Sequence, residues 1–231
     1  MTLLVVAVVS GALILGAIWG VWGNLGEKTE GFLVAVAGGA LLLSVTSELI
    51  EPSIDQSSVF HAMIGVAAGA LVFIGADYLV DRKWGSDSGG GLLAAITLDG
   101  IPENLALGVA LIGAGPMEVA ALAGSILLSN LPEAAGGAKE MGASGMSKGK
   151  VVALWAGTAA LLSLAAIAGN LLLEGVGEGW LAVIRCFAAG AVVASLATEV
   201  FPKAYKQDRH VAGIATAIGV ILAFVLGNLA S

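Results

Sequence analysis

The sequence predicts an all-α membrane protein, a polytopic bundle of eight transmembrane helices that forms a single domain over residues 1–231. Three observations lead to this prediction. Hydrophobic residues make up 58% of the chain and charged residues only 12%, about half the charged fraction of a soluble domain. Polar clusters divide the apolar sequence into eight stretches. The basic residues lie almost entirely between alternate stretches.

Each stretch has about 20 residues or more, which is enough for a helix to cross a hydrocarbon core of about 30 Å. The stretches are continuously apolar and lack the alternation expected of barrel strands. The first is expected to be a retained span and not a signal peptide, because no Lys or Arg precedes it. The predicted spans are 2–23, 31–51, 59–80, 91–113, 117–141, 149–173, 180–202 and 210–230.

The basic residues predict an orientation. Of ten Lys and Arg residues, all but Arg185 lie in or beside odd-numbered loops. Lysine and arginine concentrate on the cytoplasmic side of membrane proteins. We therefore expect a multi-pass protein of the plasma membrane with cytoplasmic odd-numbered loops and both termini extracytoplasmic. The residues beside odd-numbered loops are Lys28, Arg82, Lys83, Lys139, Lys148, Lys150, Lys203, Lys206 and Arg209.

A weak internal repeat relates the second and seventh spans. Residues 37–48 and 188–199 share small residues and a final glutamate at a constant offset, so that Glu48 corresponds to Glu199. The second span is expected to run outward and the seventh inward. The prediction is therefore an inverted-topology repeat of helices 1–3 and 6–8, a common plan in transporters.

Acidic residues within the spans mark the candidate site. A carboxylate at the centre of a membrane helix costs about 2.5–3.5 kcal/mol on insertion scales, so such residues usually pair, titrate or bind ions. Seven acidic residues fall in or at the ends of the predicted spans. Four of them lie near span ends, where a side chain can reach the membrane interface at little cost: Glu48, Glu51, Asp77 and Glu199. Asp99, Glu103 and Glu133 lie deeper and need another explanation.

The fourth and fifth spans carry related motifs, Asp99–Asn104 (DGIPEN) and Ser129–Ala134 (SNLPEA). In each motif a polar residue and a glutamate are four positions apart, Asp99 with Glu103 and Ser129 with Glu133. The two residues of each pair therefore lie on one face of their helix. The spans are antiparallel, and the two motifs are expected to meet near mid-membrane. Each proline removes a backbone donor and frees a carbonyl, which predicts proline-broken helices lining a cavity.

The expected constellation combines three carboxylates with the Ser129 hydroxyl, the Asn130 amide and two freed carbonyls. Like charges on one face repel unless one is protonated or a cation lies between them. Oxygen ligands favour hard divalent ions such as Mg²⁺, Mn²⁺ or Ca²⁺, and also admit Fe²⁺. The alternative is structural: two kinked helices whose protonated acids are hydrogen-bonded.

Other classes are disfavoured. Ten basic residues without an arginine-rich tract do not indicate nucleic-acid binding. Cys186 is the only cysteine, which excludes an internal disulfide and a multi-cysteine metal site. No Ser/His/Asp set with a nucleophile signature occurs, and we expect the protein not to be an enzyme. Membrane lipid and divalent metal ions are the expected partners, and the glycine-rich faces also allow a homodimer.

At these two motifs the chain resembles the ZIP (Zrt/Irt-like) family of divalent-metal transporters. The resemblance extends over the whole chain: eight spans, extracytoplasmic termini, and fourth and fifth helices that each contain a Pro-Glu pair. It implies that Glu103 and Glu133 bind or bridge metal. It also implies that Asp99 is a ligand at a position where the family usually has histidine. The resemblance further implies that Asn130 stands at a second-site ligand position and that Glu199 forms part of the release path.

The chain departs from the family pattern in its ligands. Neither the fourth nor the fifth span contains histidine, and Gly100 replaces an amide ligand. The loop Asp81–Gly91 lacks the histidine-rich tract that is frequent in the family. The chain is therefore expected to be a divergent member, with zinc, manganese and iron all open as the transported ion.

Two functions follow as hypotheses. The first is a carrier of divalent metal cations (zinc, iron or manganese) that moves them into the cytoplasm through a mid-membrane site. The second is a proton-coupled carrier of a small organic cation, which would use the same carboxylates as a proton relay. The candidate metal-site residues are Asp99, Glu103, Asn130, Glu133, Ser129 and Glu199.

Overall fold

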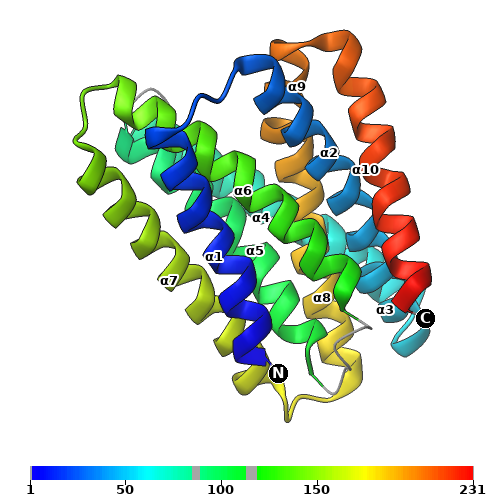
Figure 1. The fold of residues 1–231 in the computed structure, drawn as a ribbon. Coiled ribbons are helices and arrows are strands. Elements are labelled where there is room, and N and C mark those ends of the chain that lie inside the picture. The colour runs from blue at the N-terminus through cyan, green and yellow to red at the C-terminus, as the bar shows by residue number, and fades with distance from the viewer. Residues whose placement is uncertain (1, 85–88, 113–118, 231) are drawn as a thin grey trace.

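The computed structural model describes residues 2–84, 89–112 and 119–230, and within these ranges it contains helices and no strand (Figure 1). The ends of the predicted fourth and fifth spans that fall on 113 and 117–118 lie outside the described residues. The elements join into eight continuous helices along the described chain, as the sequence predicts. They are α1 (Thr2–Trp22), α2 (Glu27–Val45) with η1 (Thr46–Ile50) and α3 (Glu51–Gln56), α4 (Val59–Trp84), α5 (Gly89–Ala110), α6 (Ala120–Ala143), α7 (Lys148–Leu173), α8 (Glu178–Ser195) with η2 (Leu196–Val200) and α9 (Phe201–Gln207), and α10 (Arg209–Ala230).

The helical disruptions lie elsewhere than predicted. The helices α5 and α6 continue through Pro102 and Pro132, because a proline removes only one intrahelical hydrogen bond and the remaining bonds can carry the helix past it. The expected breaks in these two helices are therefore absent from the described residues. Wider π turns occur instead in η1 and η2, each directly followed by a short α-helix with proline in its first turn.

Local chemistry explains the π turns. Thr46 and Thr198 donate side-chain hydrogen bonds to the carbonyls four residues earlier, at 2.8 and 3.0 Å. Such bonds compete with the backbone ladder and bend helices. Pro52 and Pro202 cannot donate to the preceding turn. Single π turns within α-helices often occur at functional sites, and Glu48 and Glu199 each lie in one.

Six of the helices are long and apolar enough to cross a membrane, by length and composition, within the described residues. This is the pattern of a membrane protein. The two others, α5 and α6, carry the polar motifs and contact several other helices each. The peripheral helices are α4 and α10, which keep many large apolar side chains exposed, such as Leu71 and Ile214. Polar residues therefore concentrate on the inner helices, while apolar residues face outward.

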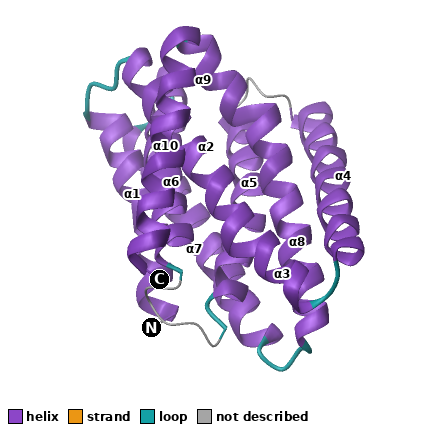
Figure 2. Cartoon of the chain, turned by 90° about the vertical axis from the view of Figure 1, so that its right-hand side faces the viewer, coloured by secondary structure: helices purple, strands orange, loops and turns teal. Residues whose placement is uncertain are grey.

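The two termini lie at the same end of the bundle (Figures 1 and 2). The connections between α1 and α2, α6 and α7, and α9 and α10 lie at the opposite end, whereas those between α3 and α4 and between α7 and α8 lie at the termini's end. We call the end opposite the termini the basic end, because Lys28, Lys148, Lys150 and Arg209 occur in the first turns of the helices that start there.

Helix pairing follows a repeated scheme. The main contacts of α1 are with α6, and the main contacts of α7 are with α5. In the same way α2 packs on α10, and α8 packs on α4 (Figure 2). Glycines make both of the latter contacts close: a Cβ at Gly39 or Gly219 would meet the backbone of the other helix, and so would one at Gly190 or Gly69. Small residues let membrane helices approach in this way.

We expect Gly190→Ala to destabilise the protein by about 1–3 kcal/mol, because the added methyl group would overlap the carbonyl oxygen of Val66. Gly157→Ala is the matched control, since a Cβ there meets nothing within 4 Å. Its effect should be neutral or slightly stabilising. Thermal unfolding in detergent measures both variants. Equal midpoints for the two would show that the α4–α8 contact tolerates a larger separation.

Candidate functional site

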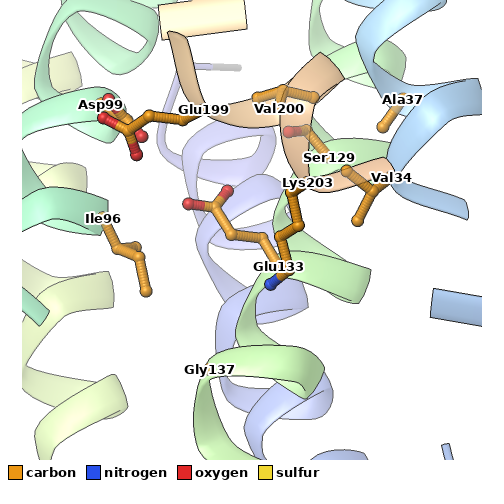
Figure 3. Close-up of a pocket in the computed structure, with 10 residues that line it drawn as sticks. All are labelled: Val34, Ala37, Ile96, Asp99, Ser129, Glu133, Gly137, Glu199, Val200 and Lys203. Atoms are coloured by element: carbon orange, nitrogen blue, oxygen red, sulfur yellow. The ribbon is translucent and has the colours of Figure 1, made fainter. Parts of the chain in front are cut away.

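A cavity of about 100 Å³ lies where α2, α5, α6, η2 and α9 converge (Figure 3). This volume accommodates a few water molecules at most. Four of the six predicted site residues line it: Asp99 from α5, Ser129 and Glu133 from α6, and Glu199 from η2. The complete lining is Val34, Ala37, Ile96, Asp99, Ser129, Glu133, Gly137, Glu199, Val200 and Lys203. The two related motifs therefore face one space, as the sequence predicts.

The carboxyl groups of Asp99 and Glu199 lie together on one side of the cavity, and that of Glu133 is directed toward the same region (Figure 3). Asp99 is 8% exposed, and its Oδ1 atom has no hydrogen-bond partner among the described residues. The Glu199 Oε1 atom is likewise buried without such a partner. A buried polar atom without a hydrogen-bond partner costs free energy. Binding of a proton or a cation between Asp99 and Glu199 would remove this cost.

Glu199 connects two other acids. Its carboxyl group lies within hydrogen-bonding reach of Asp99 and also of Asp77 on α4. Asp81, one turn further along α4, acts on both Asp77 and Glu199 through its charge. A row of carboxyl groups therefore leads from the middle of the bundle toward the basic end. The sequence alone indicated Asp77 only as a residue near a span end.

Glu103 and Asn130 do not line the cavity. Glu103 is 7% exposed and is near enough to Glu133 for their charges to interact. Asn130 is buried, and its Nδ2 atom donates a hydrogen bond of 3.1 Å to the carbonyl of Val9 on α1. This bond orients the amide and joins α6 to α1. In the observed arrangement Asn130 therefore has a structural contact.

The acids are spread along the cavity and do not form a compact centre. Within the described ranges, no group of three or more His, Cys, Asp or Glu side chains lies in an arrangement that could hold a metal ion. Four of the predicted residues therefore line the same cavity, but their side chains are not close enough together to bind one metal ion. Coordination by Asp99, Glu133 and Glu199 together would require their side chains to converge.

A basic side chain borders the same cavity. Lys203 on α9 lines it, and its Nζ atom lies 3.0 Å from Glu30 Oε1 and 4.0 Å from Glu140 Oε1. Glu30, in the first turn of α2, has a side chain only 4% exposed and also lies 3.9 Å from Lys139 Nζ. These ion pairs join α2, α6 and α9 at the basic end of the cavity.

Sequence reasoning missed Lys203 and Glu30 as residues of this region. Both fall beside predicted cytoplasmic loops, where charged side chains usually face water. Spacing held a signal for Lys203, which follows Glu199 at i+4 and therefore shares its helix face. Glu30 carried no comparable signal, because its burial depends on the packing of α2 against α6 and α9.

No protein-family model matches the chain, and no curated protein matches it either.

We expect Glu199→Gln to raise the thermal midpoint, because it removes a negative charge from between Asp99 and Asp77 while keeping the side chain's shape. A gain of about 0.5–2 kcal/mol is typical of single stabilising substitutions, including those that improve the distribution of charge. Glu174→Gln is the control, since Glu174 is exposed at the end of α7. Both are compared with the unmodified chain at pH 8 with a metal chelator.

A lower midpoint for Glu199→Gln, with Glu174→Gln unchanged, would contradict this expectation. It would mean that the carboxyl groups of Asp99 and Glu199 stabilise the fold through a shared proton.

Proposed function

We propose that the chain is a membrane carrier that moves divalent metal cations, of the zinc, iron or manganese class, across the membrane into the cytoplasm. The observation that carries the proposal is the cavity inside the bundle, lined by the carboxyl groups of Asp99, Glu133 and Glu199 together with Ser129. Buried acids in membrane helices are costly and mark ion pathways. Glu103 and Asn130 do not line the cavity, but they belong to the same two motifs as Asp99 and Ser129 and complete the candidate ligand set.

The size of the cavity favours a metal ion over a larger cargo. Sites for small organic molecules usually enclose about 300–1,000 Å³, whereas this cavity measures about 100 Å³. A metal ion with one or two remaining waters fits that volume. Carboxylate and hydroxyl oxygens are the donors that hard and borderline divalent ions accept. Binding requires Glu133 to move toward the Asp99–Glu199 pair.

Alternating access fits the internal symmetry. The pairing of α2 with α10 and of α8 with α4, each with reciprocal close-contact glycines, supports an inverted repeat of helices 1–3 and 6–8. The π turns with their glutamates occur at matching positions of the two halves. In transporters of this plan, one half moves against the other around a central site. Here that site would lie between α5 and α6.

The basic end supports the direction. Lysine and arginine concentrate on the cytoplasmic side, which would make both termini extracytoplasmic in the plasma membrane. A membrane potential that is negative inside drives cations inward. The cation would then enter at the termini's end and leave past Glu199. These assignments agree with the resemblance of residues 99–104 and 129–134 to the ZIP family, from which the chain departs by having Asp99 in place of histidine.

One observation favours the second candidate, a proton-coupled carrier. Asp77, Glu199 and Asp99 form a row of neighbouring carboxyl groups. Such rows relay protons in pumps and transporters. Under this alternative, neutralising one acid would abolish coupling to protons and leave substrate binding intact.

The test of metal binding is isothermal titration of Mn²⁺, Zn²⁺, Fe²⁺, Mg²⁺ and Ca²⁺ into the purified protein and into the double variant Glu103→Gln/Glu133→Gln. We expect at least one transition metal to bind the unmodified protein and the double variant to lose about tenfold or more in affinity, because two ligand charges disappear. Glu174→Gln, far from the cavity, should bind like the unmodified protein.

Equal binding by the double variant would place the metal elsewhere and contradict the proposed site. Absence of binding in every protein, combined with proton uptake that depends on Glu199, would favour the proton-coupled carrier.

A further inference from the structure

Lys203 is the one basic side chain among the described residues that line the cavity. It lies on α9 one helical turn after Glu199, and Figure 3 shows its side chain extending past that of Glu133. Its positive charge acts on the Glu133 carboxyl group. A cation fixed at this position opposes any second cation that approaches the same carboxylates.

The ion pairs of Lys203 hold it at the basic end of the cavity. Its Nζ atom lies 3.0 Å from Glu30 Oε1, and its side chain is 33% exposed, against 4% for Glu30. Gly136 leaves room for this pair, since a Cβ there would overlap Glu30 Oε1 and lie 3.1 Å from Lys203 Nζ. The amine therefore stands between the cavity acids and the end at which the cargo would leave.

A carrier site must bind its ion strongly enough to dehydrate it and weakly enough to release it. Three carboxylates in a low-dielectric interior would bind a divalent cation tightly. The ammonium group of Lys203 is held by Glu30, and its charge acts on one of these carboxylates, that of Glu133. A positive charge so placed lowers the affinity for a divalent cation without blocking entry from the other end.

We infer that Lys203 is a release-promoting residue, a tethered cation that competes with the divalent cargo for the Glu133 carboxylate and so sets how fast the cargo leaves. The inference rests on the proposed function and deepens it. The competing explanation is that Lys203 serves only as a structural counter-ion for the buried Glu30.

Lys139 separates the two explanations. It also pairs with Glu30, at 3.9 Å, and donates a hydrogen bond of 3.0 Å to the carbonyl of Leu25. Its side chain is 39% exposed, close to that of Lys203, but it does not line the cavity. Lys139→Met thus removes a similar charge and a partner of Glu30 while leaving the cavity lining unchanged.

The experiment measures Mn²⁺ binding, and Mn²⁺ release after chelator addition, in purified full-length protein. The variants are Lys203→Met, Lys203→Arg and Lys139→Met. A fourth, Lys203→Met/Glu30→Gln, neutralises the buried acid as well and covers the case in which Lys203→Met alone does not fold. We expect Lys203→Met and the double variant to bind Mn²⁺ about tenfold more tightly, equivalent to about 1.4 kcal/mol, and to release it correspondingly more slowly.

Lys203→Arg and Lys139→Met should stay within about twofold of the unmodified protein, because charge is kept in the first and the cavity is untouched in the second. Unchanged or weaker binding in both Lys203→Met proteins, or an equal gain in Lys139→Met, would overturn the inference and leave the proposed function standing. If the unmodified protein and every variant bind none of Mn²⁺, Zn²⁺ and Fe²⁺, both the inference and the proposed function are overturned.

Discussion

The burial of carboxyl groups inside an apolar bundle is the constraint on which the rest of this structure depends. Each such group costs about 2.5–3.5 kcal/mol at mid-membrane on insertion scales, and Asp99, Glu133 and Glu199 border one cavity. The chain accommodates them by enclosing α5 and α6 among six more apolar helices and by positioning Lys203 beside the cavity. Under the proposed function, the site needs negative charge at positions where the fold alone would be more stable without it.

Close helix packing and local helix distortion serve this arrangement together. Glycines bring α2 against α10 and α8 against α4 at backbone distance, which suits membrane helices that lack a hydrophobic force between them. The π turns occur at matching positions of the two halves, and the one in η2 contains Glu199, whose side chain lines the cavity. Glycines thus set how closely the helices pack, while threonine hydroxyls and prolines determine where the π turns occur.

Much of the fold could be predicted from the sequence, because apolar length and the distribution of lysine and arginine are local properties. Eight helices were expected, and the bounds of most agree within a few residues. The π turns could not be predicted, since a proline near Ser or Thr is equally compatible with an ordinary kink. The lining of the cavity was predicted in part, because the Pro-Glu motifs identify two of the helices that line it. Lys203 lies beyond the end of the predicted seventh span, and its place in the cavity depends on the packing of α9 beside α2, which the sequence does not reveal.

The proposed function requires that Glu133 belong to a pathway for divalent cations, and a transport measurement can show whether it does. The measurement is Mn²⁺ uptake into proteoliposomes with a negative interior potential, comparing the unmodified chain with Glu133→Gln at equal incorporation. We expect saturable, potential-driven uptake by the unmodified chain. Uptake by Glu133→Gln should be lower by about tenfold or more, because the lost charge belongs to the proposed site at which the ion is dehydrated. Equal uptake by both proteins, or no uptake of Mn²⁺, Zn²⁺ or Fe²⁺ above protein-free liposomes by either, would contradict the proposed role of Glu133.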